Sequence, residues 1–304
     1  MLYIITLISL IGIIYGAHYL IEGSTSIAYK YKIPNFIIGA LIVGVGTSLP
    51  ELTVSLLGSI QNNSDIAIGN IVGSNIFNIL GILGLTSIIF PIIITEHNKF
   101  DLQYCLGLSL ILPLLILINP SKSLGFTEGF FLVISFSIYI LVSFLRSTNC
   151  DAIQYNEESL WKSILRVSLG LIILIISCDF FVDSSIQIAY NFGLTDSAIA
   201  LTLVACGTSL PELAASLVAA FKKNTQMALG NIVGSNIFNI SFILGVCSQV
   251  SPLESSNIGV VDYSIMILAI LILLICGLFK KISRKAGIIM TLIFIGYTIY
   301  TLNF

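Results

Sequence analysis

Two glutamates, Glu51 and Glu212, each end a copy of the hexapeptide GTSLPE, at residues 46–51 and 207–212. In both copies a threonine and a serine stand four and three residues earlier, so on a helix their hydroxyls share a face with the carboxylate. The proline before each glutamate removes a backbone hydrogen bond and displaces the carbonyl four residues back. Carboxylate, hydroxyl and carbonyl oxygens are ligands of hard cations such as calcium, which takes about 6–8 of them. The motif therefore predicts a cation site built from oxygen atoms.

A second motif, GNIVGSNIFNI, also occurs twice, at residues 69–79 and 230–240. Its polar residues are spaced by four and predict a stripe on one helix face, formed by Asn70, Ser74 and Asn78 in the first copy and by Asn231, Ser235 and Asn239 in the second. The glycines of the motif have the GxxxG spacing that allows another helix to approach closely. The motif indicates helices that meet around a small polar site.

The composition places these motifs in a membrane. Of 304 residues, 57% are hydrophobic and 9% are charged, and the net charge is −2. A soluble domain carries about 25% charged residues, so most of this chain's surface must face lipid. A cytosolic enzyme and a secreted disulfide scaffold are excluded, and no nucleic-acid partner is expected because the chain is not basic.

Ten stretches are long and apolar enough to cross a bilayer, which takes about 20 residues each. They are residues 2–21, 36–60, 66–91, 103–119, 125–146, 161–182, 197–221, 227–250, 261–279 and 285–303. We therefore expect an all-α polytopic membrane protein. Glu51 and Glu212 fall within the second and seventh stretches, where a carboxylate costs on the order of 2.5–3.5 kcal/mol. Neither stretch contains a lysine or arginine, so a bound cation is the expected counter-charge.

The basic residues predict the orientation. If the N-terminus is outside, the inward connections hold twelve of the thirteen lysines and arginines, and the outward ones hold only Lys122. Positive charge accumulates on the cytoplasmic side. We expect a multi-pass protein of the cell membrane with both termini extracellular.

The two motifs belong to one internal repeat. Residues 42–84 and 203–245 align at a constant offset of 161, and 26 of the 43 positions are identical. Residues 1–146 are the expected first repeat, 147–160 a short cytoplasmic linker and 161–304 the second repeat. Each repeat holds five predicted helices. Because this number is odd, the second repeat enters the membrane from the side opposite to the first. Inverted-topology repeats are typical of secondary transporters, whose site lies at the repeat interface near the midplane.

GTSLPE and GNIVGSNIFNI, each present twice, resemble the alpha repeats of sodium/calcium exchangers in the calcium/cation antiporter superfamily. The chain looks like a compact prokaryotic member, because the short linker lacks a large calcium-sensing insert. The resemblance implies exchange of Na⁺ for Ca²⁺, about three sodium ions per calcium ion, by alternating access. Helices 1 and 6 would slide across a fixed core.

The resemblance also implies the ligands. Glu51 and Glu212 would bind calcium at the centre. Hydroxyl, amide and carbonyl groups would complete the sites for both ions, namely those of Thr47, Ser48, Ser74, Asn78 and Gly44 in the first half and Thr208, Ser209, Ser235, Asn239 and Ala205 in the second. These bound ions are substrates, and no cofactor is expected. Some relatives have an aspartate linked to potassium binding where this chain has Asn239, so we expect transport that is electrogenic and independent of potassium.

Other functions remain open at this point. The same glutamates could carry protons in a Ca²⁺/H⁺ antiporter or in one for another divalent cation. An enzyme is not expected, because the sequence has neither HExxH nor GxSxG and both histidines lie outside the motifs. A passive channel would share the ligands but would need no counter-ion. The sequence does not fix an oligomeric state and is compatible with a monomer.

Overall fold

The computed structural model describes residues 1–118, 123–146, 159–192, 207–254 and 258–303, and most of them are helical. The first half contains α1 (Leu2–Tyr31), α2 (Asn35–Ile38), η1 (Gly39–Gly44), α3 (Val45–Thr47), α4 (Leu49–Ile60), α5 (Ser64–Ile76), η2 (Phe77–Leu83), α6 (Gly84–Ile89), β1 (Ile92–Ile93), η3 (Glu96–Asn98), α7 (Lys99–Ile118), β2 (Ser123–Leu124) and α8 (Phe126–Leu145). The second half contains α9 (Leu160–Asn191), α12 (Leu210–Phe221), α13 (Thr225–Phe238), η5 (Asn239–Ile243), α14 (Leu244–Val250), β3 (Leu253–Glu254), α15 (Val260–Leu278), β4 (Lys281–Ile282) and α16 (Arg284–Asn303). Segments η1, η2 and η5 are π-helical, and η3 is a 3-10 turn.

Each of the ten predicted stretches coincides with one helix or with consecutive helices. The seventh is described only from Gly207 onward, where it continues as α12. By length and composition, seven of the described helices could cross a membrane, or eight if the bent pair α2–α3 and α4 forms one span. The prediction of an all-α multi-pass membrane protein is confirmed. The linker residues 147–158 lie outside the described part, so the division into two halves stays a prediction.

The connections sort onto two sides of the molecule. Strand β1 pairs with β4, and β2 pairs with β3. Helix α7 separates β1 from β2, so the two strand pairs lie at opposite ends of a helix about 30 Å long. Strands β1 and β3 are 161 residues apart in the sequence and therefore occupy equivalent positions in the two repeats. Because these equivalent strands lie at opposite ends, the repeats have inverted topology.

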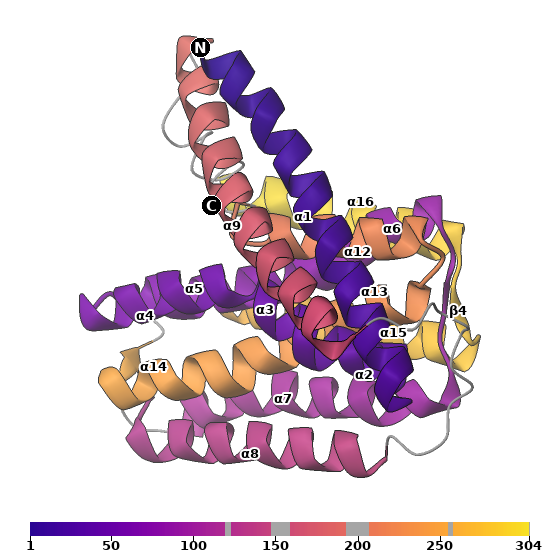
Figure 1. Cartoon of the computed structure of the whole chain (residues 1–304). Coiled ribbons are helices and arrows are strands. Elements are labelled where there is room, and N and C mark those ends of the chain that lie inside the picture. The colour runs from indigo at the N-terminus through magenta and orange to yellow at the C-terminus, as the bar shows by residue number, and fades with distance from the viewer. Residues whose placement is uncertain (119–122, 147–158, 193–206, 255–257, 304) are drawn as a thin grey trace.

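Helices α1 and α9 form an antiparallel pair that crosses the other helices obliquely (Figure 1). Thr6 near the start of α1 donates a hydrogen bond to Ser184 at 2.8 Å, and Ser163 near the start of α9 donates to Ser26 at 2.7 Å. Between these contacts the helices meet at glycines, and a Cβ added at Gly16 would lie 2.6 Å from the backbone nitrogen of Leu174. Small residues allow such close packing where lipid supplies no hydrophobic drive. The pair is therefore one tightly packed unit.

The helices that carry the second motif lie at the centre. Of the apolar stretch of α13–α14, 89% is buried, against 22% for α9. The predicted close approach is confirmed for the second half, because Gly230 and Gly234 lie directly against the backbone of Phe36 and Ala40. In the first half, the positions that the repeat makes equivalent to Phe36 and Ala40 are 197 and 201, which fall outside the described residues, so the close approach at Gly69 and Gly73 stays a prediction. Thus α5 and α13 form the core, and α9 faces mainly lipid.

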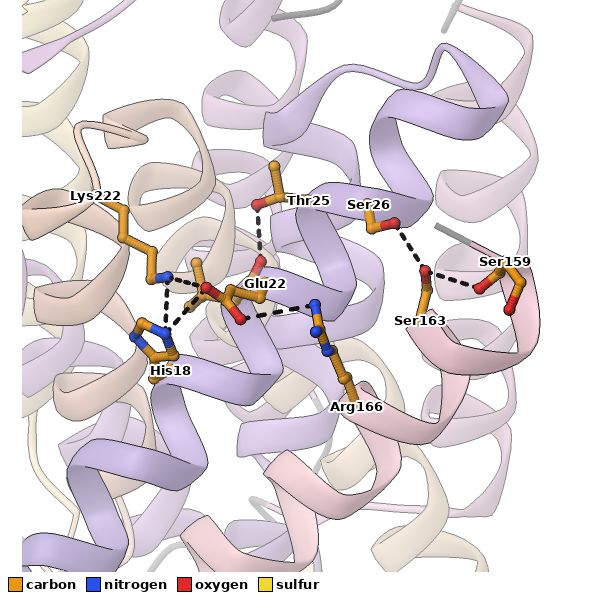
Figure 2. A network of polar contacts seen from close by, with 9 residues as sticks. His18, Glu22, Thr25, Ser26, Ser159, Ser163, Arg166 and Lys222 are labelled. Atoms are coloured by element: carbon orange, nitrogen blue, oxygen red, sulfur yellow. Dashed lines mark hydrogen bonds and ion pairs between the residues drawn. The ribbon is translucent and has the colours of Figure 1, made fainter. Parts of the chain in front are cut away.

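A polar cluster joins the α1–α9 pair to the core, as Figure 2 shows. Glu22 of α1 accepts a hydrogen bond from Lys222 Nζ at 2.9 Å, and its Oε1 lies 3.0 Å from His18 Nε2. Its second oxygen lies 3.7 Å from Arg166 Nη1 of α9. Lys222 follows the last residue of α12, so this Glu22 cluster (His18, Glu22, Arg166 and Lys222) connects the pair to a core helix.

Candidate cation site

Each GTSLPE motif interrupts its helix at the serine. In the first copy α3 ends at Thr47 and α4 begins at Leu49, and the axis of α4 is bent by 47° from that of the helical segment Asn35–Thr47. Pro50 lies in the first turn of α4, where its missing N–H leaves no intrahelical bond unmade. Ser209 precedes α12 in the same way, with Pro211 in the first turn. The prolines therefore do not lie inside a continuous helix, which is where the sequence predicted them. Each stands in the first turn after a break at the serine, and this break takes Ser48 and Ser209 out of the helical line of their carboxylates.

The two serines connect the repeats through the glutamates. Ser48 Oγ donates a hydrogen bond to Glu212 Oε1 at 2.9 Å, and Ser209 Oγ donates one to Glu51 Oε1, also at 2.9 Å. Ser209 Oγ also lies 3.2 Å from Ser74 Oγ. All five side chains are buried. The structure thus brings both glutamates and these three serines together, but each glutamate contacts the serine of the opposite motif.

Four buried oxygens of this region have no hydrogen-bond partner among the described residues: Glu51 Oε2, Glu212 Oε2, Asn78 Oδ1 and Asn239 Oδ1. They form two pairs related by the repeat. A buried acceptor without a partner costs free energy, and a buried carboxylate costs more. No ion pair within the described part of the chain involves either glutamate. The arrangement offers acceptor atoms and two negative charges, which suits a cation.

The remaining predicted ligands of the described chain bind other protein groups. Thr47 Oγ1 lies 3.2 Å from Asn231 Oδ1, and Thr208 Oγ1 lies 3.4 Å from Asn70 Oδ1. The carbonyl of Gly44 accepts hydrogen bonds from Ser235 Oγ at 3.1 Å and from Thr47 Oγ1 at 3.3 Å. Ala205, its predicted counterpart, lies outside the described residues. These groups surround the central oxygens, and Thr47 and Ser235 also lie close to the Glu212 carboxylate.

Asn70 and Asn231 have a supporting position that the spacing alone did not reveal. Asn70 Nδ2 donates to the backbone carbonyl of Glu51 at 3.2 Å and to Ser55 Oγ at 3.0 Å. Asn231 Nδ2 repeats both contacts in the second half, with the Glu212 carbonyl at 3.2 Å and Ser216 Oγ at 2.8 Å. These two residues of the stripe therefore fix the backbone that carries the glutamates.

A cavity of about 450 Å³ lies beside the site. Pro50 and Thr208, which directly precede Glu51 and Ser209, contribute to its wall. Asp179 and Asp183 of α9, about one helical turn apart, also line it. In the predicted orientation this half of α9 is the outer one. The cavity thus approaches the carboxylates from the predicted extracellular side.

Known proteins share this architecture along most of their length. The family model for the sodium/calcium exchanger protein matches residues 1–145 and 162–303. The putative antiporter CaxA of Alkalimonas amylolytica is 35% identical over 312 residues, which cover 97% of this chain and 96% of the relative. The sodium/calcium exchanger MaX1 of Methanosarcina acetivorans is 28% identical over 343 residues, which cover 98% of this chain and 97% of the relative.

A solved structure agrees as well. The sodium-calcium exchanger NCX_Mj, soaked with 2.5 mM Na⁺ and 10 mM Sr²⁺, matches with a TM-score of 0.85 and 34% sequence identity over 97% of this chain and 98% of that one. These similarities support antiport of Ca²⁺ against another cation. The chain therefore belongs to the sodium/calcium exchanger family and is a membrane transporter, not an enzyme.

Proposed function

We propose that this protein exchanges Na⁺ for Ca²⁺ and that Glu51 and Glu212 supply the charge both ions share. The observation that carries the proposal is the pair of buried carboxylates from inverted repeats, each with one oxygen bound by the opposite serine and one without a partner. The names of MaX1 and NCX_Mj, which are sodium/calcium exchangers, support the same ions. One chain supplies both halves of the site, so a monomer suffices.

The proposed ligand set begins with the oxygens that have no partner, on Glu51, Glu212, Asn78 and Asn239. Hydroxyls can rotate to present a lone pair to a cation, so Ser48, Ser74 and Ser209 add oxygens next to the carboxylates. The outer ligands would be Thr47, Thr208 and Ser235 with the carbonyls of Gly44 and Ala205. Together these groups exceed the number that one calcium ion takes, which leaves room for several sodium ions at partly different positions.

The proposed exchange is electrogenic. Two carboxylates carry a charge of −2, which one Ca²⁺ neutralises and which about three Na⁺ would overcompensate. Moving these two loaded forms in opposite directions transfers net positive charge with sodium. Potassium has no proposed role, because Asn239 is a neutral amide and the described site has no third carboxylate.

Alternating access would use the α1–α9 pair as the moving unit. The pair is tightly packed within itself, whereas the helices that carry the motifs form the buried core. The cavity lined by Asp179 and Asp183 gives a route from one side. The Glu22 cluster lies toward the other end of α1 and connects the pair to α12. Sliding of the pair would separate Glu22 from Lys222 and would keep Arg166 with it, since Arg166 belongs to the pair.

Both termini are proposed to be extracellular, in line with the distribution of lysine and arginine. An epitope placed at either end of the chain is expected to bind a membrane-impermeant antibody on intact cells. An epitope that binds only after permeabilisation would reverse the orientation, and with it the side to which the cavity opens.

The purified protein in liposomes tests the choice of counter-ion. We expect Ca²⁺ uptake when Na⁺ is loaded inside and absent outside, and no uptake when K⁺ or choline replaces Na⁺. A proton gradient imposed without Na⁺ should not drive uptake. Uptake driven by the proton gradient alone would instead favour the Ca²⁺/H⁺ alternative.

A further inference from the structure

A cluster of four hydrogen-bonded asparagine side chains lies at the contact between α5–η2 and α13–η5. Its members, Asn75 and Asn78 of the first repeat and Asn236 and Asn239 of the second, are all buried, with at most 1% exposed. Asn75 Nδ2 donates to the backbone carbonyl of Asn236 at 3.2 Å, and Asn236 Nδ2 donates to that of Asn75 at 3.1 Å. Asn78 and Asn239 extend the cluster at either end by donating to the side-chain oxygens of Asn236 and Asn75, each at 3.0 Å.

The backbone determines the direction of every amide in this cluster. An amide side chain is nearly symmetric in shape, and its direction follows from its hydrogen bonds. A backbone carbonyl can only accept, so the ends of Asn75 and Asn236 that face it must be the NH₂ groups. Their oxygens therefore point the other way and can only accept. Asn78 and Asn239 must then turn their own NH₂ groups toward these oxygens.

This direction explains the two unpartnered amide oxygens. Since the NH₂ groups of Asn78 and Asn239 are bound within the cluster, their Oδ1 atoms are left without a partner. A reversed amide would present N–H groups, which repel a cation, instead of a lone pair. Asn75 and Asn236 bind other members of the cluster through both ends of their amides, which suits a positioning role.

We propose that Asn75 and Asn236 are positioning residues that fix the amides of Asn239 and Asn78, respectively, with their oxygens toward the transported ions. The inference deepens the proposed function and rests on it. The connections cross between the repeats, since Asn75 acts on Asn239 and Asn236 acts on Asn78. Each amide ligand is thus held by the half of the protein to which it does not belong.

The crossed pairing provides its own control. Replacing Asn236 by alanine leaves Asn78 free to reverse, and N236A is expected to raise the Ca²⁺ concentration for half-maximal exchange about tenfold, with the rate at saturating Ca²⁺ changed less. If Asn236 acts through Asn78, the half-saturating Ca²⁺ concentration of the double variant N236A/N78A should be no more than about twofold above that of N78A. Asn75 acts on Asn239 and not on Asn78, so in N75A/N78A the increases in half-saturating Ca²⁺ concentration caused by each single variant should multiply.

An isosteric variant covers the case in which N236A does not fold. In Asn236→Asp the end that faces the Asn75 carbonyl must still donate, so the buried carboxyl group is expected to be protonated there, and its second oxygen keeps accepting from Asn78. N78A should therefore raise the half-saturating Ca²⁺ concentration as much in the N236D background as in the native protein. The inference would be overturned if N78A raised the half-saturating Ca²⁺ concentration equally in the N236A and native backgrounds, or did not raise it in the N236D background. Failure of the native protein to exchange Na⁺ for Ca²⁺ would be a failure of the proposed function instead.

Discussion

The Ser48 hydroxyl donates a 2.9 Å hydrogen bond to Glu212, a carboxylate in the other repeat. Ser209 and Glu51 make the same contact in the opposite sense. Each GTSLPE motif therefore supplies one carboxylate and one hydroxyl to a site shared with the other copy. This exchange of partners places the candidate ion site on the pseudo-symmetry axis, where two inversely oriented repeats meet.

Removal of either hydroxyl should weaken Ca²⁺ binding to a similar degree. Hydrogen bonds to charged groups contribute about 1.5–3 kcal/mol, so S48A and S209A are each expected to raise the half-saturating Ca²⁺ concentration by about tenfold or more. Calcium-dependent exchange in liposomes measures this effect. Ser137→Ala is a suitable control, because this hydroxyl is exposed on α8 and bonds only its own helix among the described contacts. A change as large in S137A as in S48A would contradict the assignment.

A membrane potential should alter the rate of exchange. During sodium-driven Ca²⁺ uptake into vesicles, about three Na⁺ leave for each Ca²⁺ that enters, so the interior loses net positive charge. An inside-positive potential, imposed with K⁺ and valinomycin, is expected to accelerate uptake, and an inside-negative one to slow it. Equal rates at both potentials would indicate electroneutral exchange and a different stoichiometry.

The Glu22 cluster should influence access to the cavity. Lys222→Met removes the ammonium group that joins Glu22 of the α1–α9 pair to the end of α12. If that contact favours the conformation described here, a cysteine placed at Thr53 in the cavity wall should react more slowly with a membrane-impermeant thiol reagent in K222M.

Lys223→Met is the matched control for this experiment, because Lys223 is adjacent and exposed. It should leave the reactivity of the cysteine at position 53 within about twofold of the native background, the range expected for a surface charge with little energetic weight. An equal effect of K222M and K223M would show that general charge, and not the contact with Glu22, controls access.

Close packing of the second motif predicts a difference between two glycines. A Cβ at Gly234 would collide with the backbone of Ala40, whereas none of the described atoms lies within 4 Å of a Cβ at Gly296 on α16. Overpacking costs about 1–3 kcal/mol, so G234A should lower the thermal unfolding midpoint in detergent and G296A should not. Equal midpoints would mean that the helices can separate at Gly234 without loss.

The fold followed from the sequence because lipid simplifies the pattern. A membrane helix must satisfy its backbone hydrogen bonds internally and bury few charges, so the apolar stretches marked the helices, and the repeat showed their inverted arrangement. Within these stretches, residue type alone marked Glu51 and Glu212 as candidate site residues, because a carboxylate in a membrane helix is costly. Helix bounds differ mainly at α1 and α9, which extend well beyond the predicted 2–21 and 161–182 because their polar ends remain helical.

The partners of the polar groups were not predictable in the same way. Ser48 was expected beside Glu51, three residues away on one helix, but the break at Ser48 directs it to Glu212. Asn75 and Asn236 were missed because the spacing by four that defines the stripe omits them. Their identity in both copies of the motif was the available signal. Contacts between repeats depend on how two helices pack, which spacing within one helix does not determine.

Neutralising Glu51 or Glu212 removes the charge on which the proposed ion exchange depends. Glu51→Gln and Glu212→Gln keep the shape of each side chain and remove one charge from the site, whereas Glu254→Gln removes an exposed charge on β3 as a control. Sodium-gradient-driven Ca²⁺ uptake in liposomes should fall by at least about a hundredfold in each site variant, the loss expected when a buried cation loses half its counter-charge, and remain near the native rate in E254Q. Native uptake in both E51Q and E212Q would contradict the central claim that these carboxylates carry the transported ions.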